Sequence, residues 1–421
     1  MKGKPLLVAA LASCLFTHPL TGEDRVFSLI KKLQAGESLP INQTDEQEFL
    51  KDLLSRLDVP VASQVLVFSK TSMQKSQINP RHPRALYFSD DLYVAWVQGG
   101  FVEAIAHDPD AGPLFYLIER TPSAPAPRIT SSEDCLSCHE GTRTRNVPGV
   151  LVRSLFIDPT GQPIHAAGSY LTDHASPLEK RWGGWYVTGQ HGDLRHMGNT
   201  LASWLRDEQK VQFDSEAGAN LDSLEGLIDT APYLRKGSDI VALMVLEHQV
   251  GMINRLTEAE RYFQNSFRVS RSLYPDLEEA TTLAELTGTP LSVATSYAEK
   301  IVGYMLFRDE AVLPEGGIDG DPSFQEAFQK NRRPSKASHA LKDFHLGTRL
   351  FKNRCSYLIY SDAFRALHPA LRDAVYHRLW TVLEGEDASG DFDHLGPSER
   401  QRIQGILRDT LQDLPKEFIK P

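Results

Sequence analysis

Apolar positions divide the chain into a short helical lead, a strand-rich region and a long helical half. Between residues 23 and 57, apolar side chains recur three and four positions apart, as in "GEDRVFSLIKKLQ" and "TDEQEFLKDLLSRL", which predicts helices. From 64 to 119 the pattern changes to short runs rich in β-branched and aromatic residues, which predict β-strands. These runs are "QVLVFS", "RALYFS", "LYVAWVQ", "FVEAIAHD" and "PLFYLIE".

After the predicted strands, turn-forming residues interrupt the pattern. The proline-rich "TPSAPAP" predicts a linker or an extended crossing, and "GVLVRSLFIDPTGQPIHAAG" predicts a hairpin that turns at residues 158 to 161. Residues 171 to 200 are loop-rich, and from residue 201 most segments carry helical periodicity. We therefore expect an α+β chain whose C-terminal half is mostly helical. Its expected parts are a leader at 1–22, a helical lead and β-rich region at 23–130, a loop region at 131–200 and a mainly helical region at 201–421.

The N-terminal stretch "MKGKPLLVAALASCLF" predicts an export signal. Lys2 and Lys4 form a basic start, and the apolar run after them is too short for a permanent membrane anchor. Residues 11 to 14, "LASC", match the pattern at which bacterial lipoprotein signals are cut and Cys14 is acylated. The alternative is an ordinary cleaved signal in which Cys14 is one more apolar residue. Both alternatives predict the periplasm or another extracytoplasmic compartment, with membrane attachment only through a lipid at Cys14.

Residues 135 to 139 read Cys-Leu-Ser-Cys-His, and three kinds of site use two thiols at this spacing. A structural zinc site needs four ligands, but the sequence offers no second Cys/His pair. A thioredoxin-like redox pair would follow a buried strand, whereas this motif follows linker-like sequence. Covalent haem attachment uses every residue, because Cys135 and Cys138 form thioethers to the two vinyl groups and His139 ligates the iron. We therefore predict one haem c, attached within the loop region at 131–200.

Composition limits the remaining possibilities. With the leader and the motif accounted for, Cys355 in "RCSYLIYS" has no disulfide partner within the chain and is predicted to be a buried thiol. Hydrophobic residues make up 41% of the chain and charged residues 24%, which is ordinary for a globular protein. The formal net charge is −10, and no basic stripe offsets it, which argues against nucleic acid as a partner.

Strand-like sequence on both sides of the motif makes the small all-helical cytochrome c fold a poor match. Longer phrases resemble a family of exported c-type cytochrome-like proteins common in planctomycete-like bacteria, and the resemblance covers most of the mature chain. It implies haem c and an extracytoplasmic location, but it supplies no reaction. The phrases are "SKTSMQ", "RALYFSDDLYVAWVQGG", "CLSCH", "RTRNVPGVLVRS", "RWGGWYVTGQHGDLRHMGN", "LEHQVGM" and "RLFKNRCSYLIYS".

Charge partners for the haem are expected just after the motif. Arg143, Arg145 and Arg153 follow it closely, and guanidinium groups suit the two haem propionates. The alternative is that each of these arginines is simply exposed on a loop or strand. We keep all three as candidate haem-binding residues.

Two stretches offer a sixth iron ligand. The glycine-flanked segment "RWGGWYVTGQHGDLRHMGN" contains His196 and Met197 among large aromatic residues that suit a haem edge. The predicted helix "SDIVALMVLEHQVGMINRLTEAERYF" places His248 and Met252 on one face, where they are either a haem wall or an apolar core stripe. We expect either the His196-Met197 pair or His248 to face the iron, with a lean toward the loop.

Three function classes follow from a single haem c. An electron-transfer cytochrome holds a six-coordinate iron rigidly, whereas a peroxidase- or oxidase-like enzyme keeps one iron face open. A haem-based sensor is the third class. A lone Cys-x-x-Cys-His carries no recognisable catalytic signature, so the sequence favours electron transfer, with the redox partner or small-molecule donor or acceptor unspecified.

Overall fold

The computed structural model describes most of the chain after the predicted leader. The leader with Cys14, and all of the first predicted helix except residues 26, 28 and 29, lie outside the described residues. Within the described part, no helix is both long and apolar enough to cross a membrane. The described residues are 26, 28–29, 41–108, 112–124, 126–274 and 280–419.

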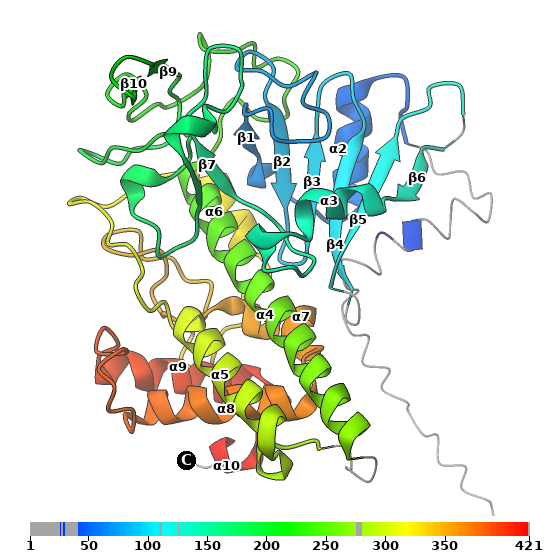
Figure 1. Cartoon of the computed structure of the whole chain (residues 1–421). Helices are drawn as coiled ribbons and strands as arrows, with labels where there is room; N and C mark the ends of the chain where they lie inside the picture. Colours follow the sequence, from blue (N-terminus) through cyan, green and yellow to red (C-terminus); the bar gives the residue numbers. More distant parts are fainter. Residues whose placement is uncertain are drawn as a thin grey trace, which may run out of the picture.

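A six-stranded antiparallel sheet forms the first half of the structure, with its strands in sequence order from β1 to β6 (Figure 1). All five strands predicted between residues 64 and 119 are confirmed, and the proline-rich stretch connects the fifth strand to a sixth. The strands are β1 (Val65–Val67), β2 (Arg84–Phe88), β3 (Leu92–Trp96), β4 (Val102–Asp108), β5 (Gly112–Glu119) and β6 (Arg128–Ser131).

The alternating side chains of the sheet enter two different apolar clusters. Leu66, Tyr87 and Val94 pack on one face with helix α2 (Glu46–Arg56), which buries Phe49, Leu50, Leu53 and Leu54. On the other face, Val65, Val67, Phe88 and Tyr93 join the core of the helical half. Successive residues of a strand point to opposite faces, so this sheet is covered on both sides.

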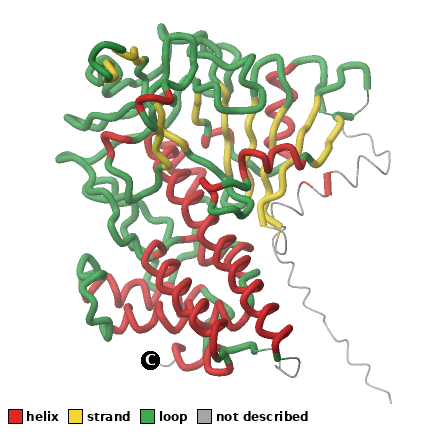
Figure 2. The backbone as a smooth tube through the Cα atoms, viewed as in Figure 1, coloured by secondary structure: helices red, strands yellow, loops and turns green. Residues whose placement is uncertain are grey.

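Loops and short elements connect the sheet to the helices, as Figure 2 shows. The predicted turn at residues 158 to 161 is confirmed by a bond from the Gly161 N–H to the Asp158 carbonyl, 2.9 Å. The prediction of helical structure from residue 201 is wrong for residues 201–239, where β9 and β10 pair as a hairpin. The short elements are η2 (Glu133–Cys135), α3 (Leu136–His139), η3 (Thr142–Thr144), β7 (Arg153–Leu155), η4 (His165–Ala167), β8 (Ser169–Leu171), η5 (Leu178–Lys180), β9 (Ala202–Leu205) and β10 (Lys210–Phe213).

The second half is helical, which confirms the predicted α+β class. It is organised around α4 (Ile240–Leu273), which begins where the Asp239 carboxylate accepts the Ala242 N–H at 2.8 Å, an N-cap bond. The first half of α4 is buried on all sides and runs against the sheet (Figure 1). The other helices are η6 (Leu283–Glu285), α5 (Gly288–Met305), α6 (Pro322–Gln329), η7 (Tyr357–Tyr360), α7 (Asp362–Arg365), α8 (Pro369–Glu384), α9 (Pro397–Thr410) and α10 (Lys416–Ile419).

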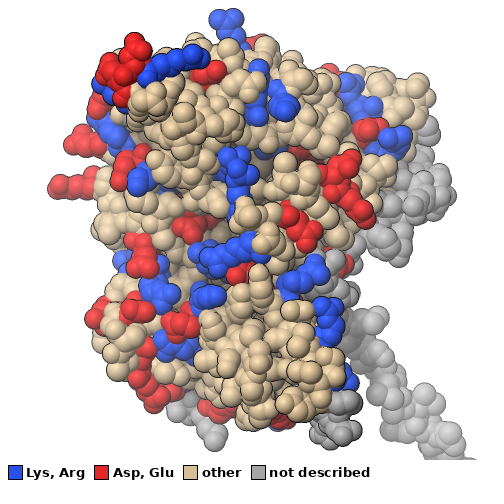
Figure 3. Space-filling view, in the orientation of Figure 1, with Lys and Arg blue, Asp and Glu red and all other residues tan. Residues whose placement is uncertain are grey.

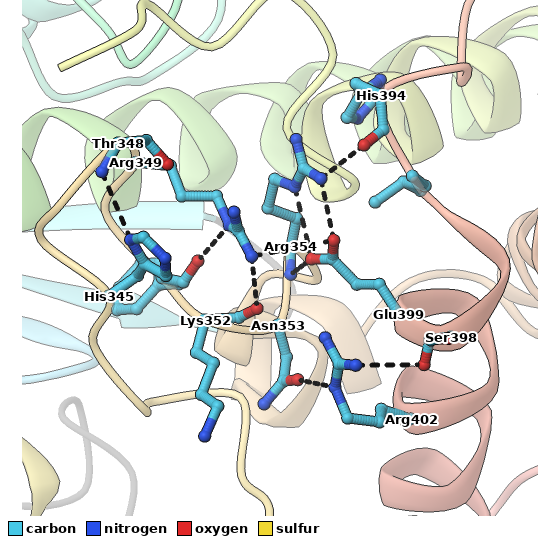
Figure 4. Close-up of polar contacts among 12 residues, drawn as sticks. His345, Thr348, Arg349, Lys352, Asn353, Arg354, His394, Ser398, Glu399 and Arg402 are labelled. Carbon is cyan, nitrogen blue, oxygen red and sulfur yellow. Dashed lines mark hydrogen bonds and ion pairs between the residues drawn. The ribbon is translucent and has the colours of Figure 1, made fainter.

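A cluster of arginines around one carboxylate ties the loop at 345–354 to α9 (Figure 4). The Glu399 side chain accepts bonds from Arg354 Nε at 3.2 Å and Nη2 at 2.8 Å, and from the Arg354 backbone N–H at 2.9 Å. Arg402 Nε donates to Asn353 Oδ1 at 3.2 Å. Elsewhere, Figure 3 shows charged side chains of both signs interspersed over one face of the molecule.

Candidate haem-binding site

The Cys-x-x-Cys-His motif follows directly on the edge strand β6 and forms a single helical turn. Cys135 ends η2, and Cys138 and His139 lie in α3, so the two thiols are three residues apart on that turn. Both are free thiols; Cys135 is partly buried and Cys138 is exposed. Burial raises the pKa of the Cys135 thiol. Two unpaired thiols on one turn are the arrangement that two thioether bonds to one porphyrin require.

The His139 imidazole is fixed by its own neighbourhood. Its Nδ1 lies 2.8 Å from the Gly149 carbonyl oxygen, and the Gly149 N–H donates to the His139 carbonyl at 2.9 Å. The ring also packs against Phe115 of β5, with ring centroids 4.9 Å apart. Because a carbonyl only accepts, Nδ1 carries the proton and Nε2 keeps its lone pair.

Electrostatics favour the neutral form of this imidazole. Burial lowers the pKa of His139, and the Arg84 guanidinium adds to the effect. Within the described part of the chain, His139 Nε2 has no hydrogen-bond partner. A neutral ring with Nδ1 bound to a backbone carbonyl and Nε2 unengaged is the form that ligates a metal.

The three candidate arginines have different roles. Arg145 turns toward α4 and pairs with Glu258 at 3.1 Å. Arg153 donates from Nη2 to Ser169 Oγ at 3.0 Å, while its Nε is buried without a partner among the described residues. Burial lowers the pKa of Arg153, and so does the repulsion of Arg143.

Arg143 and Arg153 therefore form a pair of cations near Cys138, whose negative thiolate form would stabilise charged Arg153. Neither makes an ion pair with a described carboxylate. A buried guanidinium nitrogen without an acceptor is expensive unless an anion is supplied. The residues present thus fit a haem with its propionates toward Arg143 and Arg153, but Arg145 is already engaged.

A cavity of about 200 Å³ adjoins this segment. Arg143, Arg145 and Val150 line it on one side, and Gly251 and Asn254 of α4 line it on the other. A larger cavity, about 750 Å³, lies elsewhere, between the β2–β3 turn and the helices α6 and α7, and does not include the motif.

The loop candidates for the sixth ligand are both buried. His196 Nε2 lies 3.2 Å from His191 Nε2, and its Nδ1 accepts the Gly198 N–H at 3.0 Å. Burial lowers the pKa of His196 to about 3, so this ring is neutral. The Met197 sulfur is held more weakly than the His196 ring, because it accepts a hydrogen bond from the Ser154 hydroxyl at 3.6 Å, and sulfur is a weak acceptor.

The helix candidates lie in the centre of the helical half. His248 is fully buried, with Nδ1 2.8 Å from His174 Nδ1 and Nε2 2.8 Å from Ser356 Oγ. Its ring stacks on Phe307 at 4.3 Å and on Tyr304 at 5.4 Å between centroids. Met252 is also fully buried and belongs to the helical core. In this arrangement both nitrogens of His248 are already in use.

Sequence reasoning missed several residues of the site. Gly149 and Phe115, which hold the His139 ring, and Asn254, which holds the next residue, were not candidates. The chain turns back toward the motif at residues 145–147, where Arg145 and Asn146 have positive φ; Asn146 was a usable local signal, because asparagine tolerates that conformation. No local signal identifies Asn254. Cys355 is buried as predicted.

The site as a whole is one turn with two thiols and an oriented imidazole, rather than a preformed cluster of metal-binding side chains. Within the described residues, no group of three or more His, Cys, Asp or Glu residues is arranged to hold a metal ion. A porphyrin iron needs only one protein ligand on its proximal side, so this finding does not bear on haem. Comparison with known protein families, with curated proteins and with solved structures finds no match for the chain.

Proposed function

We propose that the protein is an exported c-type cytochrome that carries one haem, bound covalently through Cys135 and Cys138, and that it acts in electron transfer. The observation that carries the proposal is the state of His139. Its Nδ1 is committed to the Gly149 carbonyl at 2.8 Å, which leaves Nε2 as the only ring nitrogen able to ligate iron. The two free thiols stand on the same turn.

Bound haem c supplies a one-electron iron couple whose potential depends on ligand, burial and nearby charge. The chain contributes the rest. The two thiols would anchor the porphyrin, and the Gly149 carbonyl would increase the electron donation of the His139 ring by accepting a hydrogen bond from Nδ1–H. Arg143 and Arg153 offer guanidinium groups to the propionates, and this pairing compensates the buried Nε of Arg153.

The decisive experiment measures the haem content of the exported protein and whether that haem resists extraction. Wild-type protein is expected to carry one haem per chain that resists extraction with acidified acetone. The variant in which Cys135 and Cys138 are both alanine is expected to lose that resistance. Replacing Cys355, which is buried far along the chain, with alanine is the matched control and should leave covalent haem in place. Wild-type protein without covalent haem would refute the proposal.

A haem enzyme or sensor is the second candidate, and a specific observation favours it. Both ring nitrogens of His196 and of His248 already have partners, and a cavity of about 200 Å³ lies beside Arg143 and Arg145. An iron left without a sixth protein ligand binds carbon monoxide readily. Rapid carbon monoxide binding with a high-spin spectrum would favour this candidate, whereas a low-spin spectrum insensitive to carbon monoxide would favour electron transfer.

A further inference from the structure

The Asn254 side chain of helix α4 forms hydrogen bonds to the backbone of the segment that follows the Cys-x-x-Cys-His motif. Its Oδ1 accepts the Val150 N–H at 2.9 Å, and its Nδ2 donates to the Val150 carbonyl at 2.7 Å. One side chain thus satisfies both polar groups of a single buried residue, as a neighbouring strand would. The position of Val150 is therefore set by the helix.

Gly149 connects these hydrogen bonds to the His139 imidazole. Its carbonyl oxygen lies 2.8 Å from His139 Nδ1, and its N–H donates to the His139 carbonyl at 2.9 Å. A Cβ added at Gly149 would lie 2.8 Å from Asn254 Oδ1 and 3.0 Å from Thr144 Cγ2. The amide of Asn254 is therefore packed directly against the residue that orients His139.

Helix α4 is a stiff base for this contact. It runs for 34 residues, and its first half is buried on all sides. The residues next to Asn254 are also anchored, because Arg255 pairs with Asp173 at 3.1 Å and Glu258 with Arg145 at 3.1 Å. Three neighbouring side chains of one helix thus hold three separate points of the loop region.

We propose that Asn254 is a positioning residue for the haem ligand. It fixes the Gly149 carbonyl and, through it, the orientation and electron donation of His139. This inference rests on the proposed function, because it concerns a haem bound at Cys135 and Cys138.

The direction of the effect follows from the hydrogen bond. A strong bond from Nδ1–H to the Gly149 carbonyl gives the imidazole more anionic character, which stabilises ferric over ferrous iron and lowers the reduction potential. Replacing Asn254 with alanine leaves the Val150 N–H and carbonyl unpaired, so the backbone at Gly149 shifts. The Nδ1–H bond then weakens, and the reduction potential rises.

The test compares four forms of the full-length exported holoprotein: wild type, Asn254→Ala, Gly149→Ala and Asn353→Ala. Asn353 is the matched control, since it is fully buried and bonds the Ala340 carbonyl at 2.9 Å and Arg402 at 3.2 Å in another region. For each form we would measure covalent haem content, reduction potential and, by NMR of the oxidised protein, the solvent exchange of the His139 Nδ1 proton.

Asn254→Ala and Gly149→Ala are each expected to raise the potential and to speed exchange of the Nδ1 proton, while both retain covalent haem. Asn353→Ala is expected to lower stability and leave both readouts at the wild-type value. If Asn254→Ala fails to accumulate, Gly149→Ala tests the proposal instead, because its added Cβ disturbs the contact between Gly149 and Asn254 from the Gly149 side.

Two results overturn the idea in different ways. The positioning role alone would be contradicted if Asn254→Ala keeps covalent haem and shows the wild-type potential and exchange rate. Where Asn254→Ala does not accumulate, the same result in Gly149→Ala would contradict it. An equal shift in Asn353→Ala would also contradict it. Wild-type protein without covalent haem would remove the proposed function, and this inference with it.

Discussion

At the scale of single residues, the partners of each ring nitrogen separate the histidines of this protein. His139 uses one nitrogen for a carbonyl and keeps the other, whereas His248 uses both, one toward His174 and one toward Ser356. Of the two loop candidates, Met197 has the weaker hold on its donor atom, a hydroxyl contact at 3.6 Å, whereas both ring nitrogens of His196 are engaged. It is therefore the loop candidate whose donor atom is freed at the smaller cost.

This comparison gives the first prediction. In a six-coordinate holoprotein, Met197→Ala is expected to abolish the long-wavelength absorption band of a thioether–iron bond and to make the iron high-spin and able to bind carbon monoxide. Met252→Ala removes an equally buried methionine from the helical core and should lower stability by roughly 2 to 4 kcal/mol without changing the spectrum. Wild-type spectra in Met197→Ala, and also in alanine variants of His196 and His248, would mean that the iron lacks these ligands.

A second prediction concerns a buried carboxyl outside the site. Burial raises the pKa of Glu310 to about 7, despite the Leu350 N–H and nearby arginines that favour its charged form. A raised pKa in the folded state means that this group's contribution to stability is present below its ordinary pKa of 4.5 and is lost as pH rises through about 7.

The variant Glu310→Gln keeps an oxygen for the Leu350 N–H, which now bonds Glu310 at 3.0 Å. Between pH 5 and pH 8 the wild type is expected to lose roughly 2 kcal/mol of unfolding free energy more than the variant does. Urea unfolding at both pH values measures the difference. Parallel pH profiles for the two proteins would show that Glu310 ionises normally.

How much of the site the sequence could predict depends on distance along the chain. Cys135, Cys138 and His139 form a local pattern, so a haem attachment site could be predicted from the sequence. Partners that fold in from afar leave no such pattern, since Ser356 lies 108 residues from His248 and Asn254 lies 104 residues from Val150. Whether a histidine ring nitrogen is free or hydrogen-bonded depends on such distant partners.

At the scale of elements, runs rich in β-branched and aromatic residues predicted the strands well, because the sheet is covered on both faces and strands such as β1 and β3 are buried at every position. Helical periodicity gave a wrong prediction at residues 201–239, where most of the backbone is loop and the hairpin of β9 and β10 is only partly buried. Helix α4 was expected from its apolar periodicity, but its burial on all sides in the first half was not. A helix that packs against both the sheet and other helices has no polar face to mark its orientation.

The contact between the 345–354 loop and α9 gives a third prediction (Figure 4). The Glu399 side chain is 7% exposed and bonds Arg354 through both oxygens. Replacing Glu399 with alanine leaves the partly buried Arg354 guanidinium without its carboxylate, with the His394 carbonyl as its remaining acceptor, and should cost about 3 kcal/mol of unfolding free energy.

The control for this element is an exposed pair on α2. Glu48 lies 3.7 Å from Lys51, and both side chains are at least half exposed, so Glu48→Gln should change stability by less than about 0.5 kcal/mol. Denaturant unfolding of both variants tests the contrast. Equal small effects would mean that the Glu399 cluster contributes no more than a surface ion pair.

At the scale of the whole molecule, the proposed function requires that the chain is exported before haem is attached. The fourth prediction is that a chain beginning after residue 22 accumulates in the cytoplasm without haem, because bacterial attachment of haem c takes place across the inner membrane. Absorbance of the purified protein and cell fractionation measure the two outcomes. Normal haem content in this truncated chain would contradict the predicted location.

The hydrogen bonds from Asn254 to Val150 also have a consequence for the order of folding, because they form later than the contact between His139 and Gly149. His139 and Gly149 are only ten residues apart, so the chain can form the ligand turn as soon as that short stretch has emerged. Asn254 follows Val150 by 104 residues and is synthesised well after the two thiols. Under the proposed function, the thioethers can therefore form before helix α4 folds against the loop region, and the redox properties of a newly made molecule would settle only when that helix is in place.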